Sequence, residues 1–220
     1  MSLTLCLHAS ASRPRVYLLD GETVLEAADD MAVGSADPTT GPSLAELVER
    51  RLAAAGATPA AIERIAVDVG PGRLSAVRAA VSFANALAFA LGRPILPIVS
   101  SHAAGRQAWR RHGRPAIVVH KAAAGAAYVG RVEDGTLTAL RYGPLAPTLV
   151  RVAAGLDALA LVGEEAEAIC DKLRGVDIAP AGDPNIEPAT FVDILRATPA
   201  GRFVAGPVHP ITEQSDEVND

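Results

Sequence analysis

The chain has 220 residues, of which half are hydrophobic but only 4% aromatic, so its core must be built from Ala, Val, Leu and Ile rather than from rings. With 20 basic and 25 acidic residues the net charge is −5, which excludes a generally basic nucleic-acid-binding surface. A local basic patch of Arg106, Arg110, Arg111 and Arg114 is one interpretation, and a solvated helix face is the favoured one.

The cysteines and the apolar runs indicate a soluble, cytoplasmic protein. Cys6 and Cys170 lie far apart without C-x-x-C spacing, which favours reduced, buried thiols. Residues 1–7 lack the basic and apolar regions of a signal peptide. The longest apolar run, Ala76–Leu91, contains three polar residues and is interpreted as too short and too polar to span a bilayer.

The first elements in chain order are predicted to be a meander of strands followed by a helix. Alternating apolar residues predict strands at residues 3–7, 16–19 and 23–27, and small polar residues predict a loop over 32–41. Ser43 with Glu46 three residues later predicts a capping box that opens a helix ending at Gly56. A helical turn is expected over residues 59–64.

The central stretch is predicted to be a buried strand, a sharp turn and a long helix. Residues 65–69 are apolar and largely β-branched, as in a parallel strand covered on both faces. The turn Gly70-Pro71-Gly72 then opens a helix, and amide groups at a helix N-terminus attract anions. A candidate anion or phosphate turn is therefore formed by Gly70, Gly72, Ser75 and Arg78.

Each member of this turn also has a structural interpretation. Ser75 can cap the helix by bonding to backbone, and Arg78 can pair with Asp68, which ends the buried strand. Asp68 is expected to be either exposed at the rim or paired.

The helix over residues 74–91 carries two apolar stripes, so it must be buried on two sides. One stripe faces its own sheet; the second is expected to be covered by the helix that Ser43 opens, by a partner subunit, or by both. The candidate interface residues are Leu44, Leu47, Val48, Ala76, Ala80, Phe83 and Leu87. A strand over 94–99 follows, and Ser100 and Ser101 are predicted to cap a helix that runs to His112.

The second half is predicted to repeat the order of the first. Strands are expected at 116–120, 127–132, 136–142, 158–162 and 176–179, and helices at 149–154, 164–173 and 188–197. Both halves thus run three strands, helix, strand, helix, which predicts a two-lobed α/β protein. The expected lobes are residues 1–105 and 106–220.

This layout contains the motif Val67-Asp-Val-Gly-Pro-Gly-Arg-Leu-Ser-Ala-Val-Arg78, followed by Gly92-Arg-Pro-Ile-Leu-Pro-Ile-Val-Ser-Ser101. With these two segments the chain resembles the TsaB (YeaZ) family. The family's segment reads approximately V-G-x-G-P-G-S-F-T-G-L-R, then G-x-P-(I/L)-x-x-V-(S/D)-(S/T). The resemblance implies a duplicated actin-like (ASKHA, ribonuclease H-like) fold. It also implies that the chain is the partner subunit of TsaD, the protein that makes N6-threonylcarbamoyladenosine in tRNA.

Three polar positions depart from the family pattern. The first strand ends His8-Ala9-Ser10 where the family has Asp-Thr-Ser, the family's His-Ser-Glu is absent from residues 37–43, and His120-Lys121-Ala122 replaces Asp-Ala-Arg. A histidine at the end of the first strand cannot replace the aspartate that supports phosphate or metal-bound water in actin-like ATPases. These departures indicate a divergent member, or a paralogue with changed duties.

The sequence predicts neither catalytic residues nor a metal site. It contains no H-x-x-x-H or H-E-x-x-H pair, no G-x-x-x-x-G-K-(S/T) loop and no G-x-S-x-G elbow, so the older label of glycoprotease attached to this superfamily finds no support. His8 and His120 both follow strands and could meet at one edge of the sheet, although a hydrogen-bonded or surface histidine is the favoured interpretation for each.

The resemblance therefore implies a non-catalytic subunit that binds TsaD, with a TsaE-type ATPase as a further partner and tRNA contacted only through the complex. ATP and metal would be bound with the partner and not by this chain alone. Two alternatives stay open: an actin-like ATPase or kinase that uses the Gly70–Gly72 turn, and a homodimeric TsaB paralogue that has left tRNA modification.

Overall fold

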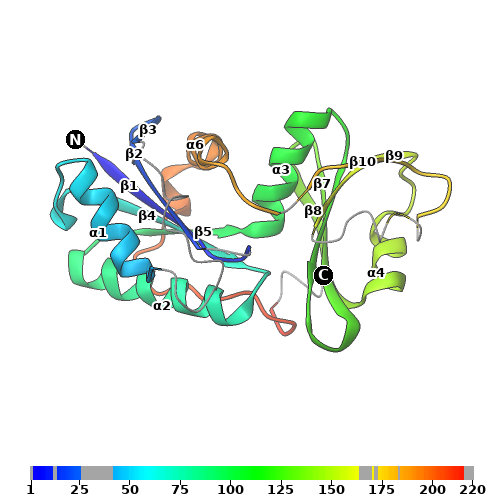
Figure 1. The fold of residues 1–220 in the computed structure, drawn as a ribbon, viewed down its shortest axis with the longest axis horizontal. Helices are drawn as coiled ribbons and strands as arrows, with labels where there is room; N and C mark the ends of the chain where they lie inside the picture. The colour runs from blue at the N-terminus through cyan, green and yellow to red at the C-terminus, as the bar shows by residue number, and fades with distance from the viewer. Residues whose placement is uncertain are drawn as a thin grey trace.

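The computed structural model describes residues 2–11, 14–25, 42–163, 170, 173–182 and 184–215. Two five-stranded sheets form the centres of two lobes (Figure 1). The first sheet contains β1 (Leu3–His8), β2 (Arg15–Asp20), β3 (Thr23–Leu25), β4 (Ile62–Gly70) and β5 (Ile95–Val99). The second contains β6 (Ala116–Lys121), β7 (Ala126–Glu133), β8 (Thr136–Pro144), β9 (Ala158–Gly163) and β10 (Asp177–Pro180).

The two sheets have the same topology. Their strand orders are β3-β2-β1-β4-β5 and, read from the matching edge, β8-β7-β6-β9-β10. In each sheet three strands form an antiparallel meander, and two later strands run parallel to the first. This confirms the two-lobed α/β architecture predicted from the order of elements and the duplicated actin-like fold that the resemblance implies.

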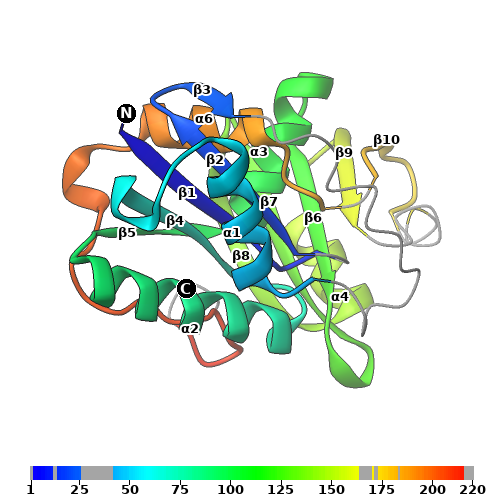
Figure 2. The ribbon, with the colours of Figure 1, turned by 60° about the vertical axis from the view of Figure 1, so that its left-hand side comes forward.

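Helices cover both faces of each sheet, and one of them comes from the opposite half of the chain. The helices are α1 (Leu44–Ala54), α2 (Leu74–Leu91), α3 (Ser100–His112), α4 (Leu145–Val152) and α6 (Pro188–Ala197). In the first lobe α1 and α2 lie on one face, while Phe191 and Ile194 of α6 pack on the other (Figure 2). In the second lobe α4 covers one face and α3 the other. Helix α6 of the second half thus packs on the first sheet, and α3 spans the predicted division at residue 105, which stays a prediction.

Local sequence signals fix several element ends. The capping box of α1 is present, since Glu46 N–H donates to Ser43 Oγ at 3.3 Å and Ser43 N–H to Glu46 Oε2 at 2.7 Å. Helix α2 has the predicted bounds and ends at Gly92, whose φ of 62° is left-handed.

Cys6 is buried, which raises the pKa of its thiol.

Other predicted ends were wrong. The helical turn expected over 59–64 is a 3-10 turn, η2 (Pro59–Ala61), because Ile62 already pairs with Leu3 in the first sheet. Helix α4 begins four residues before the predicted start. Neither Ser100 nor Ser101 caps α3, whose N-cap is Val99. The predicted loop over 32–41 and most of the predicted helix over 164–173 lie outside the described residues.

Helix α2 is exceptionally apolar for its exposure. Among the described residues it is the one helix that is long and apolar enough, by length and composition, to cross a membrane, contrary to the expectation that its polar residues exclude this. One such helix is weak evidence of a membrane span, and Val77, Val81 and Ala84 pack into the core of the first lobe. Its apolar composition therefore needs an explanation at its outer surface.

Candidate functional site

The carboxyl ends of β1 and β4 meet at Asp68, whose carboxylate is fully buried. Ile186 N–H donates to His8 Nε2 at 3.4 Å, so His8 Nδ1–H is the donor to Asp68 Oδ2, at 2.7 Å. Ser10 N–H donates to the same oxygen at 2.9 Å, and Gly70 N–H donates to Oδ1 at 2.8 Å. Asp68 is therefore paired, as one of its two predicted alternatives, but with His8 and not with the exposed Arg78.

These donors set the charge state of Asp68. Burial alone would raise the pKa of the carboxyl group. The bonds from His8, Ser10 and Gly70 outweigh burial and hold the pKa below its ordinary value. Asp68 is thus a buried carboxylate whose negative charge is stabilised by donors from β1, β4 and the turn.

The turn that follows β4 is closed by the chain itself. A Cβ placed on Gly72 would lie 2.4 Å from Ser10 Cβ and 2.5 Å from Ser10 O, so only glycine allows this approach. Arg73 N–H donates to Ser10 O at 3.2 Å, and the amide of Gly70 is taken by Asp68. The predicted anion turn therefore directs at least two of its amides inward.

The remaining members of the predicted turn lie apart from it. Ser75 and Arg78 are exposed on the first turns of α2. Ser75 does not cap the helix, because the N-cap is Arg73 and no side chain bonds to the helix end. The structure does not bring these two side chains together with Gly70 and Gly72 around one open space.

His120, at the end of β6, lies beside the same cluster from the second lobe. It is buried, and burial lowers its pKa to about 4, an effect that the charge of Asp68 opposes and the proximity of His8 reinforces. Its Nε2 has no hydrogen-bond partner among the described residues. The predicted meeting of His8 and His120 is confirmed to the extent that both lie within electrostatic reach of Asp68.

The cluster faces the second lobe, because the charge of Asp68 acts on His120, which lies near the end of a strand of the second sheet. Among the described residues no group of three or more His, Cys, Asp or Glu side chains is arranged to hold a metal ion. Chemically, the hydrogen bonds of Asp68 are suited to fix the carboxyl ends of β1 and β4 and the turn that follows β4.

The candidate interface residues fall into two groups. Leu47, Val48 and Ala80 are buried in the core of the first lobe, so their side chains are not available to a partner and the prediction is corrected there. The half-buried residues are Leu44, Ala76, Phe83 and Leu87, which pack against that core. Only parts of these four reach the surface.

The surface of α2 is instead dominated by a residue that sequence reasoning missed. The ring of Phe89 is 91% exposed, and Leu74 is 41% exposed at the other end of the helix. Ala79 and Ala86 are exposed between them, and Ala90 is exposed next to Phe89. Phe89 belongs to neither predicted stripe, and a plot of all three helix faces would have found it on the face of Arg78 and Ser82.

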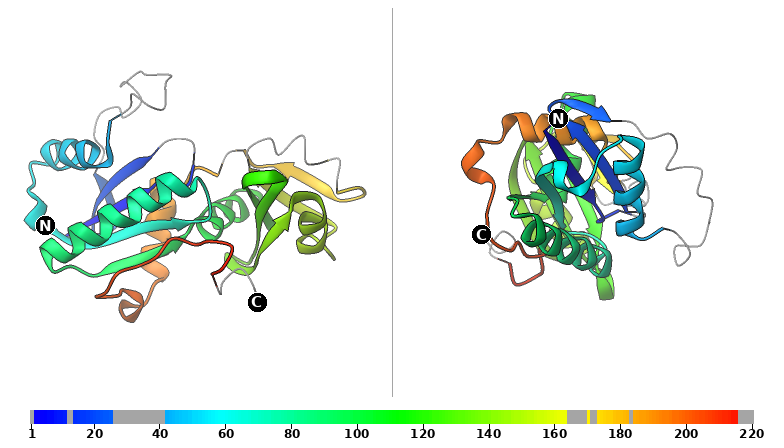
Figure 3. Two further views of the ribbon diagram at one scale, coloured as in Figure 1. Left: turned by 90° about the horizontal axis from the view of Figure 1, so that it is seen from below. Right: turned by 90° about the vertical axis from the view of Figure 1, so that its left-hand side faces the viewer.

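One flank of α2 is covered by the end of the described chain (Figure 3). The side-chain amide of Asn85 donates to Val208 O at 2.9 Å and accepts from Val208 N–H at 3.0 Å. Ile211 N–H donates to Val69 O at 2.7 Å, and the side chains of Val208 and Ile211 enter the core. The chain's own C-terminal segment therefore covers part of the second side of α2 that was predicted to be buried.

Three of the four arginines of the predicted basic patch are ion-paired, and the fourth, Arg106, donates from Nη1 to Gly135 O at 3.3 Å. Arg110 pairs with Asp193, Arg111 with Glu187 at 2.6 Å and Arg114 with Asp177 at 2.9 Å. These ion pairs link the C-terminal part of α3 and the residues after it to β10, to Glu187 and to α6, so the solvated-face interpretation describes these arginines better than a nucleic-acid patch.

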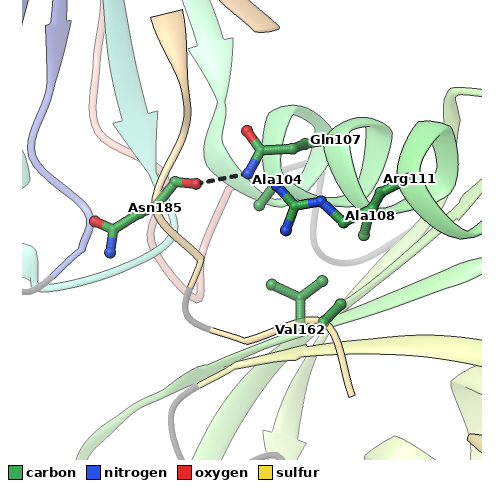
Figure 4. A pocket seen from close by; sticks show the side chains of 7 residues that line it. Ala104, Gln107, Ala108, Arg111, Val162 and Asn185 are labelled. Atoms are coloured by element: carbon green, nitrogen blue, oxygen red, sulfur yellow. Dashed lines mark hydrogen bonds between the residues drawn. The ribbon is translucent and has the colours of Figure 1, made fainter. Parts of the chain in front are cut away.

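A small polar cavity lies beside these arginines (Figure 4). Gln107 Nε2 donates to Asn185 O at 3.1 Å, while Gln107 Oε1 accepts from Glu187 N–H at 2.9 Å. The cavity volume is about 10 Å³, which is the space of one water molecule. It is too small for an organic ligand.

Comparison with known proteins gives matches in sequence and in structure. Residues 42–143 match the family model described as TsaD, tRNA N6-adenosine threonylcarbamoyltransferase. The tRNA N6-adenosine threonylcarbamoyltransferase of Ralstonia pickettii (strain 12J) is 50% identical over 52 residues, which are 24% of this chain. The matched segment spans only 15% of that relative's length.

Two crystal structures match nearly the whole chain. One is an uncharacterized protein with similarity to peptidase YEAZ from Pseudomonas aeruginosa, with a TM-score of 0.71 and 23% identity, covering 97% of this chain and 100% of the other. The second is YeaZ from Pseudomonas aeruginosa, with a TM-score of 0.66 and 23% identity, covering 95% and 100%. The chain therefore has the fold of YeaZ and matches the TsaD family model over residues 42–143, so the predicted resemblance to the TsaB (YeaZ) family is confirmed at the level of the fold.

Proposed function

We propose that this chain is a TsaB-type subunit that binds and organises a TsaD-type catalytic subunit, which makes N6-threonylcarbamoyladenosine in tRNA. The observation that carries the proposal is the outer face of α2, where Phe89 is 91% exposed beside a row of exposed alanines. A large aromatic ring surrounded by small residues is the typical anchor of a protein interface. Small neighbours let the backbone of a partner helix approach closely.

The closed strand ends favour association over catalysis. In the family pattern an aspartate ends the first strand, whereas here His8 occupies that position and its ring is bonded to Asp68 at 2.7 Å. Gly72 lies against Ser10, where a phosphate loop would need open amides. The chain would therefore act within a complex whose ATP and metal are bound with the catalytic partner.

The expected setting follows from the same proposal. The chain would be cytoplasmic, a TsaE-type ATPase would be a further member of the complex, and tRNA would be contacted only through it. The net charge of −5 is consistent with a subunit that does not hold tRNA by itself.

The proposal is tested by co-purification with the TsaD-type subunit of the same organism. Phe89→Ser should weaken the complex at least about thirtyfold, as expected for loss of an interface anchor. Val150→Ser is the matched control, because Val150 is 51% exposed on α4 of the other lobe. Undiminished binding by Phe89→Ser would reject the α2 face as the interface, and no binding by the wild type would reject the function.

The two alternatives give different results. A homodimeric paralogue would be a dimer in light scattering, would dissociate on Phe89→Ser and would not bind the TsaD-type subunit. An ATPase or kinase would bind ATP and Mg²⁺ at micromolar concentration in isothermal titration of the chain alone.

A further inference from the structure

A second surface feature lies on the other lobe, away from α2. A groove of about 390 Å³ opens between strands β7 and β8 and helix α4. Three arginines line it, Arg131, Arg141 and Arg151, with Glu133 and Thr138 as its other polar residues. In the β7–β8 ladder Arg131 is opposite Ala139 and Arg141 is opposite Val129, so the two arginines lie on one face of the sheet, the face that α4 covers.

Arg131 has a structural role in the groove. Its Nη1 donates to Val152 O at 3.2 Å and to Ala154 O at 2.9 Å, which satisfies carbonyl groups at the C-terminus of α4. Its Nη2 donates to Glu133 Oε1 at 2.8 Å, and this bond lowers the pKa of the Glu133 carboxyl. The guanidinium thus covers the negative end of the helix and neutralises the one carboxylate in the groove.

Arg141 and Arg151 have no such partner among the described residues. The bond that Arg141 makes is from Nη1 to the carbonyl of its neighbour Leu140, at 3.0 Å, although the side chain is half-buried. Arg151 is exposed at the end of α4, and neither guanidinium is ion-paired with a described carboxylate. Three arginines against one glutamate leave two uncompensated positive charges in the groove, within a chain of net charge −5.

We propose that this groove binds a phosphate group held by Arg141 and Arg151. The planar guanidinium presents paired N–H donors that match two phosphate oxygens, and a half-buried guanidinium without a carboxylate is stabilised when an anion supplies the missing acceptors. The volume is that of a small-molecule site and exceeds what a single ion fills. The phosphate could belong to a free phosphorylated small molecule or to an RNA backbone, and this inference does not depend on the proposed TsaD partner.

The test uses the full chain at low salt, with sodium pyrophosphate and ADP in isothermal titration and a labelled single-stranded RNA in fluorescence polarisation. The double variant Arg141→Gln/Arg151→Gln removes both charges while keeping polar side chains. Arg174→Gln/Arg202→Gln is the matched control, because both arginines are exposed and lie outside the groove. Circular dichroism confirms that each variant is folded.

We expect the wild type and the control to bind at least one probe, and the double variant to bind it at least about tenfold more weakly. Binding of pyrophosphate or ADP without RNA identifies a free phosphorylated ligand as the source. RNA binding that is lost in the double variant and weakens steeply with salt identifies the backbone. Absence of binding to all three probes, or equal binding by the double variant, overturns the proposal.

Discussion

The stretch from Asp68 to Phe89 contains two regions with opposite surfaces. At one end, Asp68, Gly70 and Gly72 are packed against the first strand, and the Asp68 carboxylate accepts hydrogen bonds from His8, Ser10 and Gly70. At the other end, Phe89 presents its ring to solvent. In an actin-like fold the strand ends between the lobes form the natural ligand site. Here the chain uses that position for its own packing, while its unpaired surface lies on the following helix.

The comparison predicts that changes at the strand ends affect folding, whereas changes on the outer face of α2 affect only association. Unfolding measurements on variants at the two ends of this stretch therefore distinguish the two regions.

Asp68→Ala should cost the most. The variant removes the acceptor for the His8 ring and for the amides of Ser10 and Gly70, all of which are buried. Each buried donor left without an acceptor costs about 1–3 kcal/mol, so urea denaturation should show a loss of about 3–5 kcal/mol in the free energy of unfolding. Glu49→Ala on the exposed side of α1 is the control, expected within about 0.5 kcal/mol of the wild type. A small effect of Asp68→Ala would mean that these hydrogen bonds do not stabilise the strand ends.

Acid should weaken the fold through His120. Burial lowers the pKa of this side chain to about 4, from 6.5 when unfolded, so between these pH values the unfolded chain takes up a proton that the folded chain does not. Stability therefore falls as the pH is lowered from 6.5 towards 4, by up to about 3 kcal/mol. His102, whose pKa is also lowered by burial, adds in the same direction.

Urea denaturation at pH 7, 5.5 and 4.5 measures this dependence. His120→Asn and His120→Leu remove the titrating group, so most of the slope between pH 6.5 and 4.5 should disappear in whichever variant is better folded. A slope equal to that of the wild type in both would assign the pH dependence to other groups.

Gly72→Ala should have an intermediate effect. The new methyl group would lie 2.4–2.7 Å from the Cβ, carbonyl oxygen and Cα of Ser10, and backbone atoms cannot move aside cheaply. Overpacking of this kind costs about 1–3 kcal/mol. Gly201→Ala, where no atom lies within 4 Å, is the matched control and should leave the thermal midpoint unchanged. Equal midpoints for the two variants would contradict the tight contact between the turn and the first strand.

The sequence predicted well those features that are set locally. The bounds of α2 follow from an uninterrupted helical pattern and from Gly92, and the start of α1 follows from the Ser43–Glu46 box. The closeness of His8 and His120 could be expected from the sequence. Each lies near the carboxyl end of the first strand of its sheet, at corresponding places in a duplicated fold.

Features that depend on distant residues could not be predicted. The partners of Arg110, Arg111 and Arg114 lie 63 or more residues away in sequence, on segments whose approach is set by α6 crossing to the first sheet. The burial of Ala80 and the exposure of Phe89 depend on how α2 is rotated against that sheet and on the C-terminal segment that Asn85 holds. Helical periodicity identifies stripes but does not say which of them the chain itself covers.

Phe89→Ser should have the smallest effect on folding. The ring is 91% exposed, so its loss removes almost no buried apolar area, and the free energy of unfolding should stay within about 0.5 kcal/mol of the wild type. Phe83→Ser, six residues earlier on the same helix, is the contrasting variant, because its half-buried ring packs against the core and its loss should cost more than 1 kcal/mol. Urea denaturation of both separates the two faces of α2. If Phe89→Ser were as destabilising as Phe83→Ser, the Phe89 ring would be covered in solution, and the outer face of α2 would belong to the fold of the free chain instead of to an interface.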